Sequence, residues 1–266
     1  MKLAISNIGW TAEYDAVVYD WMKAYGYSGL EIAPTRIFPD QPYHRKNEAK
    51  LWRDAIKQTY GFCIPSMQSI WFGKQEKLFG TDEERTVLSN YTKEAIAFAA
   101  AIDCKNLVFG CPRNRNRPKG ADEKEAISFF REMGDFAAKM GTVIGMEANP
   151  EIYHTNYIND TSSALELIQM VQSKGFLLNL DVGTMLCKGE RVSELIGKVH
   201  LIHHVHISEP GLMPIQKRDF HQELCEVLRS GGYTGFISIE MGKVDDITVL
   251  DKTMQYVSSI FLNDGI

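Results

Sequence analysis

The 266-residue sequence has few cysteines, and their arrangement excludes the usual disulfide frameworks and zinc–thiolate sites. The five cysteines are an odd number, and no two of them form a Cys-x-x-Cys pair. A small set of unpaired cysteines is typical of proteins that fold in a reducing compartment. We therefore expect a cytoplasmic protein.

Long apolar runs are also missing. No segment approaches the roughly 18 consecutive apolar residues that a membrane-spanning helix requires. The N-terminal stretch MKLAISNIGWTAEYD reaches polar residues too early for a signal peptide. Lysine and arginine number 29 against 34 acidic residues, a net charge of −5, so no global attraction to nucleic acid or anionic lipid is expected. Neither a membrane nor a nucleic acid is predicted as a partner, and any anion binding must be local.

The chain lacks a glycine-rich phosphate loop after its first apolar segment, where SNIGWT stands instead. Such a loop is expected in a doubly wound open sheet, which is the alternative fold. What the sequence does have is a repeated alternation of strand-like apolar runs with segments of helical period. The runs lie at 3–8, 29–33, 62–67, 106–110, 143–147, 177–181, 200–207 and 236–240.

Eight strands that alternate with eight helices, without a break in composition, predict an α/β fold of the (β/α)₈ TIM-barrel type. The predicted helices include a segment at 191–198 that separates the sixth strand from the seventh. The length is within the range in which such a barrel forms one unit. We therefore predict a single domain over residues 1–266.

The last four predicted strands each end in a residue that can bind a metal: Glu147, Asp181, His206 and Glu240. Their separations of 34, 25 and 34 residues match one strand–helix repeat, so the side chains should lie at similar heights. Sites in these barrels form where the strands end, and consecutive strands are neighbours. We expect these four side chains to converge on one side of the barrel mouth.

Three carboxylates and an imidazole do not stay charged side by side without a cation, because unpaired buried carboxylates take up protons instead. A divalent metal ion would relieve this repulsion. Oxygen-rich ligation with one nitrogen suits manganese, magnesium or cobalt(II), and it also permits zinc. The sequence thus predicts one divalent metal ion as a cofactor.

With these motifs, the sequence resembles the xylose-isomerase-like sugar isomerase and epimerase superfamily, which includes the D-tagatose 3-epimerases. The resemblance covers most of the chain, with its specific motifs in residues 141–241. It implies that Glu147, Asp181, His206 and Glu240 hold the metal and that Glu147 and Glu240 are catalytic and move a proton next to a carbonyl. The predicted third and fourth strands end in SMQS and FGCP, without the histidines that the related endonuclease IV branch uses for its zinc ions.

The chain departs from the ketose epimerases at two substrate-binding positions. Those enzymes have a histidine three residues after the aspartate and an arginine six residues after the metal-binding histidine. Here these positions hold Thr184 and Leu212. The resemblance therefore supports the metal chemistry more strongly than the recognition of a free ketose.

Further residues at the expected mouth are candidates for contact with a small-molecule carbohydrate. His204, two residues before His206, either supports the metal ligand from behind or is a core histidine of the barrel. The loop CPRNRNRPKG favours an anionic carbohydrate such as a sugar phosphate, with a solvated basic loop as the alternative. The candidate substrate contacts are Trp10, Glu31, Trp71, Arg113, Arg115, Asn149 and Glu209.

The reaction predicted from these residues is metal-dependent isomerisation or epimerisation of a sugar or sugar phosphate. A second hypothesis is a lyase that resembles 2-keto-myo-inositol dehydratase, on the same barrel and with the same metal ligands. A third is a barrel that binds a carbohydrate without turning it over. The sequence is also compatible with a homo-oligomer.

Overall fold

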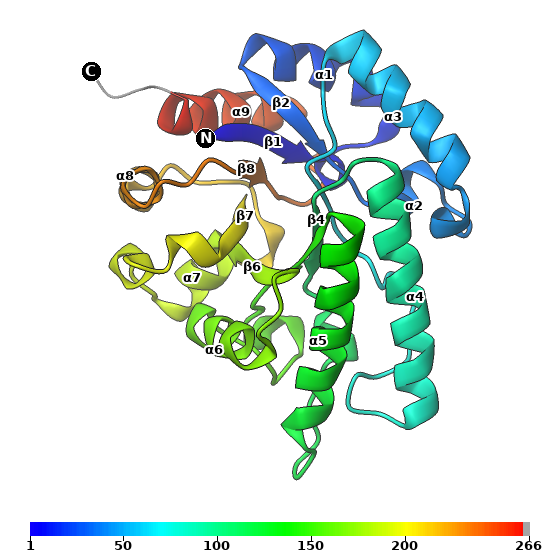
Figure 1. The fold of residues 1–266 in the computed structure, drawn as a ribbon. Helices are drawn as coiled ribbons and strands as arrows, with labels where there is room; N and C mark the ends of the chain where they lie inside the picture. Colours follow the sequence, from blue (N-terminus) through cyan, green and yellow to red (C-terminus); the bar gives the residue numbers. More distant parts are fainter. Residues whose placement is uncertain (263–266) are drawn as a thin grey trace.

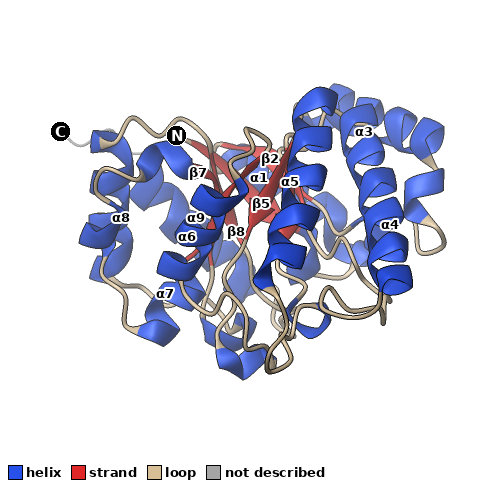
Figure 2. Ribbon diagram, turned by 60° about the horizontal axis from the view of Figure 1, so that its bottom comes forward, coloured by secondary structure: helices blue, strands red, loops and turns tan. Residues whose placement is uncertain are grey.

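Eight parallel strands form a nearly closed barrel, and helices cover its outer surface (Figures 1 and 2). The computed structural model describes residues 1–262, so the last four residues of the predicted domain lie outside it. The predicted (β/α)₈ TIM barrel is confirmed. Its strands are β1 (Lys2–Ser6), β2 (Tyr27–Glu31), β3 (Ser66–Met67), β4 (Asn106–Phe109), β5 (Val143–Met146), β6 (Phe176–Asp181), β7 (Ile202–Ile207) and β8 (Phe236–Ile239).

The barrel is weakest between β2 and β3. Hydrogen-bonded neighbours run in the order β2-β1-β8-β7-β6-β5-β4-β3, and only isolated bridges, Gly29 with Cys63 and Ile32 with Met67, join the two ends. Pro65 lacks a backbone N–H group and interrupts β3, which is only two residues long. The closure is nevertheless real, since the Leu30 amide donates to the Cys63 carbonyl at 2.9 Å.

Helices follow the strands around the barrel, and α4 and α5 are the longest of those in residues 1–262 (Figure 1). Helix α4 begins with a capping box in which the Thr81 side chain accepts from the Glu84 amide and the Glu84 side chain accepts from the Thr81 amide. The α-helices are α1 (Asp15–Ala24), α2 (Pro34–Ile37), α3 (Lys46–Tyr60), α4 (Asp82–Ala101), α5 (Glu123–Met140), α6 (Thr161–Val171), α7 (Val182–Lys188), α8 (Asp219–Ser230) and α9 (Thr248–Phe261).

The helix predicted at 191–198 is wrong in place and type. An α-helix, α7, begins directly after β6, and the carboxylate of Asp181 caps it by accepting from the Thr184 amide at 2.6 Å. Gly189 ends α7 in the left-handed conformation with a φ of 66°. Residues 191–198 instead contain the 3-10 turn Val192–Leu195, and a second turn, Val199–Leu201, leads into β7.

Alternation along the strands separates a polar barrel interior from an apolar outer layer. In β7, Val205 and Ile207 belong to the buried hydrophobic core, whereas His204 and His206 face Glu31 of β2. Glu31 is completely buried. The interior at the carboxyl ends of the strands is therefore built from hydrogen-bonding groups, which support a site, rather than from close-packed aliphatic side chains alone.

No helix among residues 1–262 is both long and apolar enough to cross a lipid bilayer.

Candidate metal centre at the barrel mouth

The ends of β5 to β8 bring together Glu147, Asp181, His206 and Glu240. Asp181 and His206 are partners in the pairing of β6 with β7, and Glu147 and Glu240 each follow the last residue of their strand by one position. One ligand atom from each of the four residues lies within 4.8 Å of the others. The four side chains are thus positioned to hold one metal ion.

The carboxylate of Glu147 is held by two amide side chains. Asn179 Nδ2 donates to Oε1 at 2.9 Å, and Asn149 Nδ2 donates to Oε2 at 3.1 Å. A Cβ atom on Gly110 would approach Glu147 Oε2 to 2.8 Å, so a larger residue directly after β4 would displace this carboxylate oxygen. The position of Glu147 is therefore fixed by its surroundings from β4, β5 and β6.

Arg115 holds the backbone of Glu147 and the side chain of Asn149 in place through buried hydrogen bonds. Its guanidinium group is fully buried and donates to the Glu147 carbonyl at 2.8 Å, to Asn149 Oδ1 at 3.0 Å and to the Ile158 carbonyl at 3.2 Å. Burial lowers the pKa of Arg115 to about 10. The predicted contact of Arg115 with substrate does not fit this position, because its donors already serve the protein backbone and Asn149.

Asp181 is oriented by its own helix and by β7. Besides the capped amide of Thr184, the carboxylate accepts a hydrogen bond from Ser208 Oγ, and Ser208 in turn accepts from the Gly183 amide at 2.8 Å. These bonds hold the start of α7 against the end of β7. Each oxygen of Asp181 thereby accepts one hydrogen bond, Oδ1 from the Thr184 amide and Oδ2 from Ser208 Oγ, while the carboxylate still lines the cavity described below.

The imidazole of His206 separates two groups of carboxylates. Its Nδ1 lies 2.9 Å from Glu147 Oε1 and 3.3 Å from Glu240 Oε2. Its Nε2 lies 3.1 Å from Glu31 Oε2, and His204 Nε2 lies 2.8 Å from the same oxygen. Glu31 therefore lies behind His206, on the side away from the other three carboxylates, and is not among the residues that line the cavity.

Charge crowding is visible in the pKa values of this cluster. Burial and repulsion from Glu147 raise the pKa of Asp181 to about 6, and burial and Glu240 raise the pKa of Glu147. Burial lowers the pKa of His206, but Glu31, Glu240 and Glu147 outweigh it and raise the pKa well above the ordinary value. The three carboxylates thus have too little positive charge around them to balance their own, and a divalent cation would supply it.

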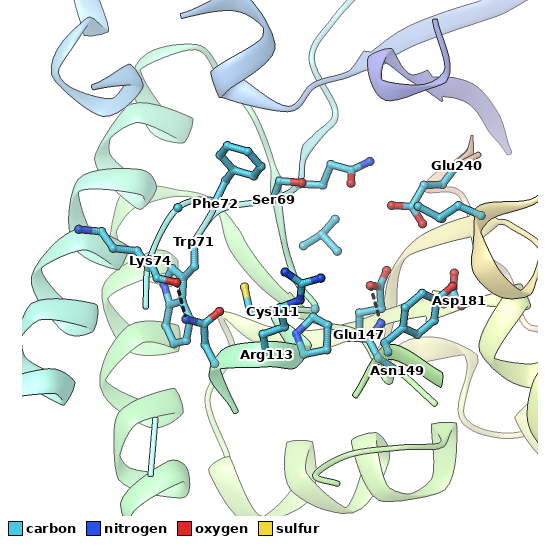
Figure 3. Close-up of a pocket in the computed structure, with 18 of the residues that line it drawn as sticks. Ser69, Trp71, Phe72, Lys74, Cys111, Arg113, Glu147, Asn149, Asp181 and Glu240 are labelled. Carbon is cyan, nitrogen blue, oxygen red and sulfur yellow. Dashed lines mark hydrogen bonds between the residues drawn. The ribbon is translucent and has the colours of Figure 1, made fainter. Parts of the chain in front are cut away.

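A cavity of about 540 Å³ opens beside the cluster, with Glu147, Asp181 and Glu240 on one wall (Figure 3). The opposite wall comes from the loops after β3 and β4 and carries Trp71, Phe72, Lys74 and Arg113 (Figure 3). Ser69, Cys111 and Leu212, which also line the cavity, adopt left-handed backbone conformations with φ of 57°, 44° and 54°. Backbone strain of this kind concentrates at functional loops.

Three of the predicted substrate contacts, Trp71, Asn149 and Arg113, line this cavity. Trp71 is 2% exposed, and its Nε1 donates to Thr92 Oγ1 at 2.8 Å, so its ring forms part of a fixed wall. The structure thus leaves Arg113 as the exposed member of this group.

Two further predicted contacts lie away from the cavity lining. Trp10 is buried and its Nε1 donates to Asp15 Oδ1 at 2.7 Å. Glu209 is also buried and forms a two-oxygen ion pair with Arg218, in which Nε and Nη2 lie 2.8 and 2.6 Å from the carboxylate oxygens. Both side chains pack and pair within the protein, and neither lines the cavity, so their contact with a substrate stays a prediction.

Sequence reasoning missed several residues that hold the cluster. Asn179 stands two positions before Asp181 on β6, and Ser208 stands two positions after His206, directly beyond the end of β7, so strand alternation could have found both. Gln68, whose Nε2 donates to Glu31 Oε1 at 3.2 Å, follows the interrupted strand β3 and had no such signal.

Together, these features define a (β/α)₈ barrel with a carboxylate–histidine cluster, positioned to hold a metal ion, at the carboxyl ends of its strands. A model of the xylose isomerase-like TIM barrel family matches residues 19–260, and the chain belongs to this family. No curated protein sequence matches the chain.

Solved structures with the same fold include three of particular interest. A 3-keto-D-glucoside 4-epimerase from E. coli is 20% identical, with a TM-score of 0.77 over 97% of this chain and 99% of that one. A D-psicose 3-epimerase from Clostridium cellulolyticum, solved with D-tagatose, is 17% identical, with a TM-score of 0.76 over 98% and 99%. The IOLI protein, solved with a bound zinc atom, is 14% identical, with a TM-score of 0.71 over 98% and 97%.

Proposed function

We propose that this protein is a metal-dependent sugar isomerase or epimerase that transfers a proton at a carbon next to a carbonyl. The observation that carries the proposal is the convergence of three carboxylates and one imidazole beside a cavity of ligand size. The epimerase activities and the sugar and zinc ligands named for the structural neighbours agree with this proposal.

The residues present fit a divalent ion. Glu147, Asp181, Glu240 and Nδ1 of His206 would hold it, because this nitrogen is the ring atom that faces the carboxylates. Glu31 would accept the proton of Nε2 and so leave the Nδ1 lone pair free for the metal. The donor set suits manganese, magnesium or cobalt(II), with zinc also acceptable. When bound, the ion would polarise the carbonyl of the substrate and acidify the neighbouring C–H group.

Glu147 and Glu240 are the proposed proton-transfer groups. They come from strands at the two ends of the β5–β8 set and approach His206 Nδ1 at 2.9 and 3.3 Å. One carboxylate removes the proton and the other returns it. Hydrogen bonds from Asn179 and Asn149 fix Glu147, and burial raises its pKa, which makes it a stronger base.

The test is exchange of solvent deuterium into sugars recovered after incubation with the manganese-loaded protein. Glu147→Gln and Glu240→Gln should each reduce exchange by about 10²–10⁴-fold, the usual contribution of a positioned acid or base. Glu151→Gln is the matched control, since Glu151 follows the same strand but is exposed and paired with Lys188. Near-normal exchange in either active-site variant with metal bound would refute the assignment. A deoxy or unsaturated product would instead indicate the lyase.

A further inference from the structure

The cavity has charges of opposite sign on its two walls. Its acidic residues within the described chain, Glu147, Asp181 and Glu240, lie together at the ends of β5, β6 and β8. Its basic residues, Lys74, Lys77 and Arg113, lie on the loops that follow β3 and β4; Lys74 and Arg113 are labelled in Figure 3. In a protein with a net charge of −5, this separation is a local feature rather than a general excess of basic residues.

Arg113 is the basic group most available to a ligand. Within residues 1–262 its guanidinium group has no carboxylate partner, whereas Arg117 on the same loop is paired with Glu123 at 3.2 Å. The Lys77 ammonium group donates to the Arg113 carbonyl at 2.8 Å and so supports the loop. Lys74 is partly buried, and its ammonium group lies 4.1 Å from the centre of the Tyr91 ring.

The basic wall is preorganised by contacts between the two loops. The buried side chain of Asn114 donates to the carbonyls of Lys74 at 3.0 Å and Glu76 at 2.9 Å, and the Leu78 amide donates to the Asn114 carbonyl at 2.8 Å. These bonds fix the backbone directly after Arg113 against the loop that follows β3. A guanidinium group on such a support can form a forked pair of hydrogen bonds with an oxyanion.

Across the cavity, Leu212 contributes an apolar side chain from the loop after β7, and Thr184 is buried with its hydroxyl donating to the Ala148 carbonyl at 2.8 Å. Positive charge for a ligand therefore comes from the loops after β3 and β4 alone, among the described residues of the lining. A substrate whose reacting carbons lie at the carboxylate wall would place its far end against these loops.

We propose that the substrate is a sugar with an oxyanion group, a phosphate ester or a carboxylate, at the end distant from its reacting carbons. Arg113 binds this group. The inference rests on the proposed function, because the metal site sets which end of the sugar reacts. It narrows the substrate class from carbohydrates in general to anionic ones.

The test measures binding of paired probes to the manganese-loaded protein by calorimetry. The pairs are D-fructose with D-fructose 6-phosphate, D-tagatose with D-tagatose 6-phosphate, and D-glucose with D-glucuronate. At least one anionic probe should bind at least about 10-fold more tightly than its neutral partner. Whether the phosphate pairs or the carboxylate pair shows the larger difference in affinity identifies the oxyanion group of the substrate. Arg113→Gln should weaken that probe about 10- to 100-fold, as expected for loss of a charge-assisted hydrogen bond, and should leave the neutral sugar unchanged.

Lys119→Gln is the control, since it removes the same charge from an exposed position on the same loop, outside the cavity lining. Equal affinity within every pair, or an equal effect of the two substitutions, would overturn the inference. If manganese and neutral sugars bind and exchange deuterium, the proposed function stands and only the anionic class fails. If manganese does not bind, the proposed function itself fails.

Discussion

The Glu31→Gln substitution should weaken divalent-metal binding while the barrel stays folded. Glu31 is completely buried, and its Oε2 lies 3.1 Å from His206 Nε2 and 2.8 Å from His204 Nε2. Glutamine keeps the size of the side chain but removes its negative charge. Nε2 of His206 then has a neutral amide oxygen in place of a carboxylate as acceptor, which holds its proton less strongly, and Nδ1 becomes a poorer ligand. Loss of such a support for a metal-binding histidine typically lowers affinity by 10- to 100-fold, or about 1.4–2.7 kcal/mol.

Calorimetric titration of Mn²⁺ into the metal-free protein at pH 7 measures this loss, with Glu151→Gln as an exposed control. A second readout is the titration of the His206 ring by NMR in the metal-free state. Removal of the Glu31 charge should lower the pKa of His206, which burial lowers and the surrounding carboxylates raise above its usual value. A folded variant whose manganese affinity stays within twofold of wild type would refute this account of how Glu31 acts.

Three other measurements test separate parts of the structure. In urea denaturation, Arg115→Met should lower the free energy of unfolding by about 3 kcal/mol, because it leaves buried acceptors without donors. Arg113→Met should change the free energy of unfolding by less than about 0.5 kcal/mol. Equal effects of the two substitutions would contradict the positions assigned to the two arginines. Manganese affinity should fall about fivefold from pH 6 to pH 5, because the pKa of Asp181 is raised to about 6 and protons then compete with the metal; a flat profile would argue against Asp181 as a ligand. Burial lowers the pKa of His221 to about 4, so the unfolded chain binds a proton first as pH falls. The contribution of His221 to the free energy of unfolding is therefore fully present above about pH 6.5 and falls by roughly 2–3 kcal/mol towards pH 4. Denaturation measured across this pH range should show that His221→Phe loses less stability than wild type.

The strand ends of the second half of the barrel could be predicted because each ligand interrupts an apolar run at a regular interval. Glu147, Asp181, His206 and Glu240 lie one strand–helix repeat apart, and a barrel then brings them to one side of the mouth. The spacing of these residues in the sequence and the order of the strands in the barrel therefore both predict that the four side chains converge. The convergence of the cluster followed from this agreement.

Loop residues could not be assigned in this way, because their neighbours come from distant parts of the chain. Arg113 and Arg115 stand two positions apart in one basic loop, yet one is exposed at the cavity and the other is fully buried beneath Glu147. The carbonyl of Ile158, which accepts from Arg115, belongs to the loop after β5. Only the tertiary structure reveals that this arginine supports the site instead of contacting a ligand.

The helix after β6 illustrates a limit of periodicity itself. Residues 182–188 form a short helix whose first turn is capped by Asp181, one of the four residues of the proposed metal site. The residues Val182, Gly183, Thr184 and Met185 are all buried, so this helix has no exposed polar face in its first turn to mark it as helical. The helix was predicted instead for the more amphipathic segment that follows, residues 191–198.

The most direct test of the metal centre is the anomalous diffraction of crystals grown with manganese, measured at the manganese absorption edge. The structure predicts one peak per chain, in contact with Glu147, Asp181, Glu240 and Nδ1 of His206, and the loss of that peak in Asp181→Asn. The absence of a peak in the wild-type protein, or a peak bound by other residues, would contradict the central claim that these strand ends form a metal site.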